Sequence, residues 1–200
     1  MELTVTPTPL HGVVLIQPRV FPDARGFFLE TWSARDFAAA GIDAVFVQDS
    51  HSRSTLGVLR GLHYQDMRAP QAKLVRCTVG SIFDVAVDIR HGSPTFGQWT
   101  SVELTAENKL QLFIPPGFAH GFQATSDIVE VQYKQTAYYT PAVEGTVAWN
   151  DPDVGVAWPL PDPILSDRDR AARSLEEYAR QPAFHFGRRG GAPRYPGGTA

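Results

Sequence analysis

Apolar residues along the chain come in short runs that are rich in β-branched and aromatic side chains and are separated by turn residues. Runs of this length and composition are typical of β-strands. The predicted strands cover residues 12–17, 26–32, 44–48, 57–65, 72–79, 81–90, 98–105, 110–116 and 128–136. The two strands on either side of Gly80 are expected to pair as a hairpin, and the last strand to continue to Tyr139. Apolar residues at every second position of the strand 81–90 predict that one of its faces lies in the core.

Two segments carry helical signals instead. Ser33 is a suitable N-cap for a short helix that Gly41 would end, and Ser166 begins a second helical segment, DRDRAARSLEEYAR. These elements predict a single all-β domain over residues 1–185, a double-sheet jelly roll or barrel with a short early helix and C-terminal helical segments. Residues 186–200, with five glycines and two prolines, are predicted to be a flexible tail.

Composition and charge exclude several classes of function. With 200 residues and a hydrophobic fraction of 43%, the chain can bury a substantial core. A formal net charge of -3 argues against nucleic-acid binding, although local arginines can still hold one anionic ligand. The single cysteine, Cys77, rules out an intramolecular disulfide, and the first ten residues lack signal-peptide character. No apolar run is long enough for a membrane helix. We therefore expect a cytoplasmic protein with no membrane partner.

The run Gly57–Gln65 (GVLRGLHYQ) contains two polar residues that could take part in binding or catalysis, inside an otherwise apolar strand. Arg60 needs a partner there, which could be a bound phosphate or carboxylate, or an internal aspartate. His63 is either a buried, hydrogen-bonded histidine or a catalytic one. Strict alternation puts the two side chains on opposite faces, so a shared pocket requires a bulge, which Gly61 would permit.

Other candidate residues are less decisive on pattern alone. Lys73 opens a strand, where a lysine is more often solvated than functional, and Tyr133 and Tyr139 fit either a pocket or ordinary packing. The segment PPGFAHGF (115–122) resembles the second motif of cupins, which often presents a metal ligand. The first cupin motif needs an H-x-H pair, and His63-Tyr64-Gln65 lacks the second histidine. A metal site would thus be incomplete.

Many segments, in the same order, resemble the dTDP-4-dehydrorhamnose 3,5-epimerase family of cupin-fold enzymes. They are PRVFPDARGFFLE, VQDSHSRSTLGVLRGLHYQ, QAKLVRCTVGSIFDVAVDIRHGSPTFGQW, PPGFAHGF, YKQTAYYTPAVE, WNDP and LSDRD, and they run from Gly12 to about Arg180. The resemblance implies a cupin jelly roll that uses no metal or cofactor. It also implies a dTDP-4-dehydro-6-deoxy-D-glucose substrate that is inverted at C3 and C5 through an enolate, giving dTDP-4-dehydro-L-rhamnose.

The resemblance further implies roles for individual residues. His63 matches the family's base, and Asp169 matches the carboxylate that orients it and favours its protonated form. Tyr133 matches the acid on the opposite face of the sugar, and Lys73 the cation near the C4 oxygen.

Substrate contact is implied for Arg25, Phe28, Glu30, Gln48, Arg60, His120 and Tyr139. In the family pattern, Arg60 and His120 bind the diphosphate, and Phe28 and Tyr139 pack on the thymine. The family forms a homodimer whose N-terminal strand region crosses to the partner. By that pattern Arg25 and Glu30 serve the neighbouring subunit's site.

One departure from the pattern is Ser50, where many members carry asparagine. It leaves open a monoepimerase that acts at C3 or C5 only, in a specialised antibiotic-sugar pathway. A catalytically silent sugar-nucleotide-binding cupin and a metal-dependent cupin oxygenase or isomerase are the remaining alternatives. The sequence does not separate a rhamnose pathway from a secondary-metabolite pathway, and it carries no information on rates.

Overall fold

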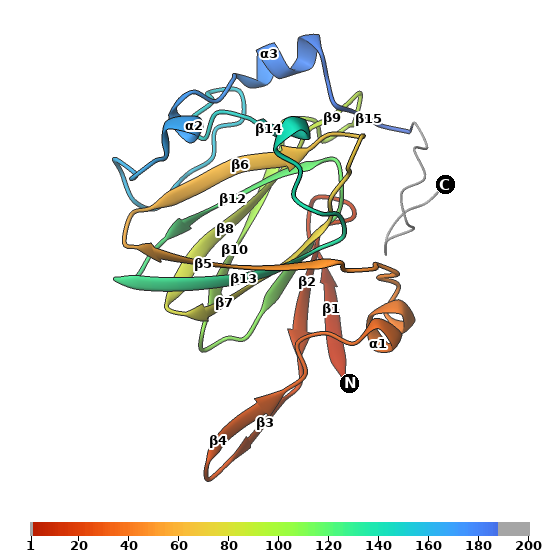
Figure 1. The fold of residues 1–200 in the computed structure, drawn as a ribbon, viewed down its shortest axis with the longest axis vertical. Coiled ribbons are helices and arrows are strands. Elements are labelled where there is room, and N and C mark those ends of the chain that lie inside the picture. The colour runs from red at the N-terminus through yellow and green to blue at the C-terminus, as the bar shows by residue number, and fades with distance from the viewer. Residues whose placement is uncertain (1, 188–200) are drawn as a thin grey trace.

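Two antiparallel sheets face each other in the computed structural model, which describes residues 2–187 (Figure 1). The larger sheet has the order β1 (Leu3–Pro7), β2 (Val14–Pro18), β11 (Gln111–Ile114), β7 (Lys73–Val79), β13 (Ile128–Gln135) and β5 (Gln48–Thr55). The smaller has the order β10 (Trp99–Thr105), β8 (Ser81–Asp88), β12 (Phe118–Ala124), β6 (Leu59–Gln65) and β14 (Glu144–Thr146). This arrangement confirms the predicted all-β jelly roll.

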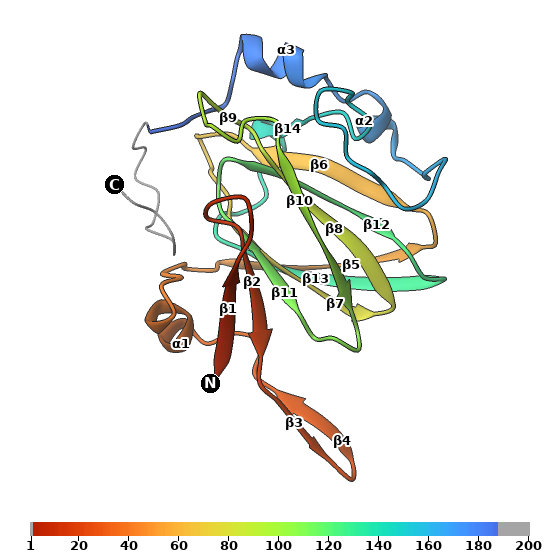
Figure 2. The ribbon, with the colours of Figure 1, turned by 180° about the vertical axis from the view of Figure 1, so that it is seen from behind.

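Short elements complete the fold. The hairpin of β3 (Val20–Asp23) and β4 (Gly26–Leu29) projects from the body of the molecule, and β9 (Arg90–His91) pairs in parallel with β15 (Phe184–His185) (Figure 1). The helices are α1 (Ala34–Ala39), the 3-10 helix η1 (Pro141–Val143), α2 (Asp167–Arg170) and α3 (Leu175–Arg180). Seen from behind, α2 and α3 lie along the smaller sheet, while α1 lies near β1 and β2 (Figure 2).

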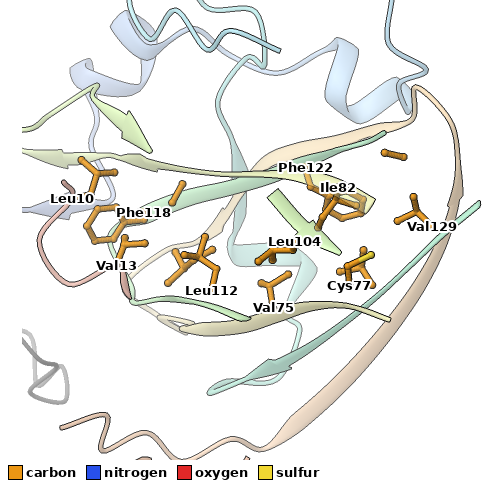
Figure 3. Packing of buried hydrophobic residues seen from close by; sticks show 14 residues of the cluster. Leu10, Val13, Val75, Cys77, Ile82, Leu104, Leu112, Phe118, Phe122 and Val129 are labelled. Atoms are coloured by element: carbon orange, nitrogen blue, oxygen red, sulfur yellow. The ribbon is translucent and has the colours of Figure 1, made fainter. Parts of the chain in front are cut away.

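The space between the two sheets is filled at one end by a cluster of buried apolar side chains (Figure 3). Val75 and Leu112 of the larger sheet and Ile82 of the smaller sheet are each fully buried there. Burying one such side chain contributes about 1.5–3 kcal/mol. This cluster holds the sheets together and leaves the other end of the interlayer space for polar residues.

Two further clusters cover the outer faces of the sheets. Val85 and Val87 of β8, with Ile89 directly after the strand, form the predicted core face, and they pack beneath Leu175 and Tyr178 of α3. The C-terminal helical segment therefore belongs to the core. On the larger sheet, α1 contributes Phe37 to a corresponding cluster with residues of β2, β7 and β11.

The prediction of a strand over residues 44–48 is wrong. The strand β5 instead runs from Gln48 to Thr55 and has the polar sequence QDSHSRST. Apolar periodicity cannot reveal this strand, since the face that it turns inward meets a polar cavity and not the core. Gln48 and Ser50 line that cavity, and Ser54 hydrogen-bonds to Arg60. The predicted set also lacks the strands β1, β3, β12, β14 and β15.

The predicted hairpin about Gly80 is also wrong. Its two strands, β7 and β8, lie in different sheets, with β7 pairing to β11 and β13, and β8 to β10 and β12. The turn at Gly80 (φ +73°) carries the chain from one sheet to the other. Sequence alone cannot distinguish this crossing from a hairpin, because both need a glycine between two apolar strands.

The C-terminal helical segment divides into two short helices, each with its own N-cap. Ser166 accepts a hydrogen bond from the Asp169 amide, and Ser174 forms a capping box with Glu177. Between the two helices, Arg173 makes a β-bridge with Val147.

Two other predictions concern segment ends. β13 ends at Gln135, so Tyr139 lies beyond the strand. The domain boundary at residue 185 stays a prediction, and most of the predicted tail, residues 188–200, lies outside the described part of the chain.

Candidate active site

A cavity of about 540 Å³ opens between the sheets at the polar end of the interlayer space. His63 reaches it from β6 of the smaller sheet, whereas Lys73 and Tyr133 reach it from β7 and β13 of the larger sheet. Asp169 enters from α2, which follows a long connection. The four residues with implied catalytic roles thus line one cavity. A ligand there would have the imidazole on one side and the lysine and tyrosine on the other.

A bulge in β6 brings Arg60 and His63 to the same face. His120 of β12 pairs with His63 and Phe122 with Arg60, so three steps along β6 match two steps along β12. The extra residue is accommodated at Gly61, which has φ of +145°. A side chain at Gly61 would place a Cβ only 2.5 Å from the Gly121 Cα. The bulge expected at Gly61 is confirmed, and it requires glycine for both conformation and space.

His63 and Asp169 form a short hydrogen bond, with 2.5 Å between Nε2 and Oδ1. A carboxylate only accepts, so Nε2 carries the proton and Nδ1 keeps a free lone pair in the neutral ring. Burial lowers the pKa of His63, and this outweighs the opposing effect of Asp169. For Asp169, burial is the largest single influence and acts to raise the pKa, but the interactions with His63, Ser166 and Arg168 together outweigh it, so the pKa is lowered. The pair therefore combines a neutral imidazole with a charged carboxylate, which suits a base.

The ammonium group of Lys73 is held among charged groups away from bulk water. Burial lowers its pKa to about 8, while the negative charges of Glu144 and Asp84 act in the opposite direction. Lys73 remains mostly protonated at neutral pH. A cation in this position can stabilise a negative charge that develops on a ligand oxygen.

Glu144 and Arg168 also belong to the site, although no role was predicted for them from the sequence. Glu144 Oε2 accepts from the Tyr139 hydroxyl at 2.9 Å and pairs with Arg168. The Arg168 guanidinium also lies 3.2 Å from His63 Nε2. Both residues fall inside segments that resemble the family, YKQTAYYTPAVE and LSDRD. No periodicity or spacing signal separates them from neighbouring surface charges.

The residues expected to bind the nucleotide part divide into two groups, and the first lines the cavity. It comprises Gln48, Arg60, His120 and Tyr139. Gln48 accepts from the Tyr139 amide at 2.9 Å, which ties the loop after β13 to β5. Arg60 hydrogen-bonds to Ser54 and to a backbone carbonyl, and within residues 2–187 it has no ion pair. The alternative of a salt bridge to an internal aspartate is therefore wrong, and the guanidinium charge remains available for an anion.

Comparison with known proteins decides the family. A family model described as dTDP-4-dehydrorhamnose 3,5-epimerase matches residues 7–177. The enzyme of that name from Pseudomonas aeruginosa is 51% identical over 177 residues, which cover 88% of this chain and 97% of the relative. The chain belongs to the dTDP-4-dehydrorhamnose 3,5-epimerase family. It is accordingly an isomerase with the cupin fold.

Solved structures of similar proteins include several members of this epimerase family. The dTDP-6-deoxy-D-glucose-3,5-epimerase of Legionella pneumophila, in complex with dTDP-4-keto-L-rhamnose, has a TM-score of 0.90 and 43% identity, covering 94% of this chain and 100% of that one. A 3'-monoepimerase from Streptomyces bikiniensis, in complex with dTDP-quinovose, has a TM-score of 0.85 and 35% identity, covering 90% and 91%. The fold thus serves both double and single epimerisation.

The second group of residues expected to contact the substrate lies outside the cavity of this chain. Arg25, Phe28 and Glu30 are exposed on or beside the β3–β4 hairpin, which points away from the sheets (Figure 1). Arg25 pairs with Asp23 on the same hairpin at 2.6 Å. One chain therefore does not bring these three residues to its own cavity.

Two remaining observations concern ligands and membranes. Within residues 2–187 no three His, Cys, Asp or Glu side chains gather in a way that could hold a metal ion. The same residues include no helix that is long and apolar enough to cross a membrane.

Proposed function

We propose that this protein inverts C3 and C5 of dTDP-4-dehydro-6-deoxy-D-glucose and forms dTDP-4-dehydro-L-rhamnose. The observation that carries the proposal is the placement of a neutral, carboxylate-bound imidazole opposite a lysine and a tyrosine across one cavity. Sequence identity of about half to the curated epimerases, over most of the chain, supports the same substrate.

The first step is proton removal by His63. The hydrogens at C3 and C5 both lie beside the C4 carbonyl, so loss of either gives an enolate. The free Nδ1 of His63 takes the proton, and Asp169 stabilises the imidazolium that results. The Lys73 ammonium compensates the charge that forms on the C4 oxygen.

Return of the proton on the other face completes the inversion. Tyr133 projects from the larger sheet, across the cavity from His63, and donates its hydroxyl proton to the carbon. One proton leaves and one returns at each carbon, so the sugar is neither oxidised nor reduced.

The nucleotide is expected to extend toward the outer part of the cavity. Arg60 and His120 bind the diphosphate, because the cavity presents an arginine that has no carboxylate partner among the described residues. Tyr139 packs on the thymine, and Gln48 holds the backbone of that loop in place.

We further propose a homodimer in which Arg25, Phe28 and Glu30 complete the neighbouring subunit's site. Phe27 and Phe28 are 56% and 65% exposed on a hairpin that projects from the chain, which favours burial against a partner. Mixing the Arg25→Ala and His63→Asn variants tests this arrangement. A mixed dimer would contain one site with neither substitution, so activity should return. No gain over the separate variants, with subunit exchange verified, would contradict the shared site.

The reaction itself is tested in D2O with dTDP-4-dehydro-6-deoxy-D-glucose. Proton NMR follows exchange at C3 and C5, and a reductase traps the product so that its configuration can be determined. Exchange and inversion at both carbons are expected, and His63→Asn should lose a factor of about 10²–10⁴ or more in rate. A near-normal rate for this variant would exclude the mechanism.

The other outcomes identify the alternatives. Exchange and inversion at one carbon would establish a monoepimerase, a possibility that the Streptomyces bikiniensis relative makes concrete. Bound substrate without exchange at either carbon would indicate a sugar-nucleotide-binding protein with no catalytic activity.

A further inference from the structure

Asp84 is a buried carboxylate beside the cavity to which the mechanism gives no role. It lies in β8, between β10 and β12, and is 0% exposed. Its Oδ1 accepts a hydrogen bond from His120 Nε2 at 2.7 Å. Its Oδ2 is buried, and no group within residues 2–187 hydrogen-bonds to it. A buried carboxylate oxygen without a hydrogen-bond donor lowers the stability of the fold, so we expect Asp84 to have a functional role that compensates for this loss.

The charged groups around Lys73 indicate what that role is. Negative charge reaches Lys73 from Glu144 in β14 and from Asp84 in β8, and positive charge from Arg168 in α2. His63 of β6 and His120 of β12 line the same cavity. Tyr133 of β13 also lines this cavity.

Glu144 is already engaged by other groups. Its Oε2 accepts from the Tyr139 hydroxyl and pairs with the Arg168 guanidinium, so much of its negative charge is compensated there. Asp84 has only His120 as a hydrogen-bond partner in the described chain. Of the two carboxylates that act on Lys73, Asp84 is therefore the less compensated.

Building on the proposed epimerase function, we propose that Asp84 is a positioning residue that holds the His120 imidazole and keeps a positive charge on Lys73 during enolate formation. It touches neither the reacting carbons nor the C4 oxygen. It acts through His120, which faces the ligand's anionic group, and through the field at Lys73. The cavity would then contain two carboxylate–imidazole pairs with different tasks. His63 with Asp169 removes the proton, and His120 with Asp84 maintains the electrostatics of binding and of the enolate.

The substitution Asp84→Asn removes the charge with almost no change in shape. The pKa of Lys73 is about 8, so its ammonium is lost on the alkaline side of the pH profile. Without Asp84 the loss should occur at lower pH. We expect the alkaline limb of kcat/KM for exchange at C3 and C5 to move down by about one pH unit. Asp84→Glu, which retains the charge but displaces His120, should keep the limb in place and raise KM.

Asp88→Asn is the matched control. Asp88 is a fully buried aspartate on the same strand, but it binds Arg90, Ser93 and Thr95 and does not line the cavity. Its substitution should lower the melting temperature and leave the pH profile unchanged. If Asp84→Asn does not fold, as judged by circular dichroism, Asp84→Ser takes its place in the comparison.

The outcomes separate this inference from the proposed function. A shift of the alkaline limb in Asp84→Asn or Asp84→Ser, but not in Asp84→Glu or Asp88→Asn, supports the role of Asp84. An unshifted limb with only a lower melting temperature would overturn it, because the carboxylate would then be purely structural. Absence of exchange in the unsubstituted enzyme would instead refute the proposed function.

Discussion

Gly61 allows a direct test of the bulge that builds the site. Replacing it by alanine introduces a Cβ at φ of +145°, where L side chains are strained by about 1–3 kcal/mol. The same Cβ would lie 2.5 Å from the Gly121 Cα and 3.1 Å from the His120 carbonyl oxygen, both backbone atoms. Overpacking of this kind costs about 1–3 kcal/mol, so Gly61→Ala should lose about 2–6 kcal/mol in free energy of unfolding. That is a large part of a typical total of about 5–15 kcal/mol.

Gly57 supplies the matched control at the start of the same segment. It also has positive φ, +80°, but nothing lies within 4 Å of a Cβ built on it. Gly57→Ala should therefore lose only the conformational part, about 1–2 kcal/mol. The difference between the two variants measures the close approach of β6 to β12.

The assays are urea unfolding for stability and proton exchange for activity. In a domain of this size, Gly61→Ala should lower the melting temperature by roughly 5–20 °C. It should also reduce exchange, because any shift of β6 displaces His63 from Asp169. Equal destabilisation by both alanines, with activity retained in Gly61→Ala, would refute the reasoning that this contact sets the position of His63.

Three further predictions concern the reacting groups. The pKa of Lys73 is about 8, so kcat/KM should fall above that pH as the ammonium deprotonates, and a profile flat to pH 10 would contradict its role. Asp169→Asn keeps the shape but removes the charge that supports the His63 imidazolium, and it should reduce kcat by about 10²-fold or more in a steady-state assay; a change below threefold would exclude the pair. Tyr133→Phe should keep deuterium exchange at C3 and C5, because His63 is intact, and should lose inversion. Unchanged inversion, determined from the trapped product, would assign the acid to another group.

The sequence alone determined the class of fold and supplied the candidate residues of the site. Short β-branched runs and frequent turn residues are local signals, and they were sufficient for the all-β jelly roll. The residues His63, Lys73, Tyr133 and Asp169 were found through motif segments that resemble one family. Their spacing along the chain would not have identified them, since Asp169 lies 106 residues from His63 and only packing brings the two together.

Tertiary structure decided what depends on the surroundings of a residue. The polar strand β5 has no apolar face, because it borders a cavity, so periodicity could not find it. Gly80 joins strands of different sheets, and nothing local distinguishes this crossing from a hairpin turn. The pKa of His63 is lowered, although Asp169 favours the imidazolium, because the loss of hydration on burial outweighs one hydrogen bond. The effect of the Asp84 charge on Lys73 also depends on the fold. Asp84 lies in β8 and Lys73 in β7, and only the folded chain brings these strands of different sheets close together.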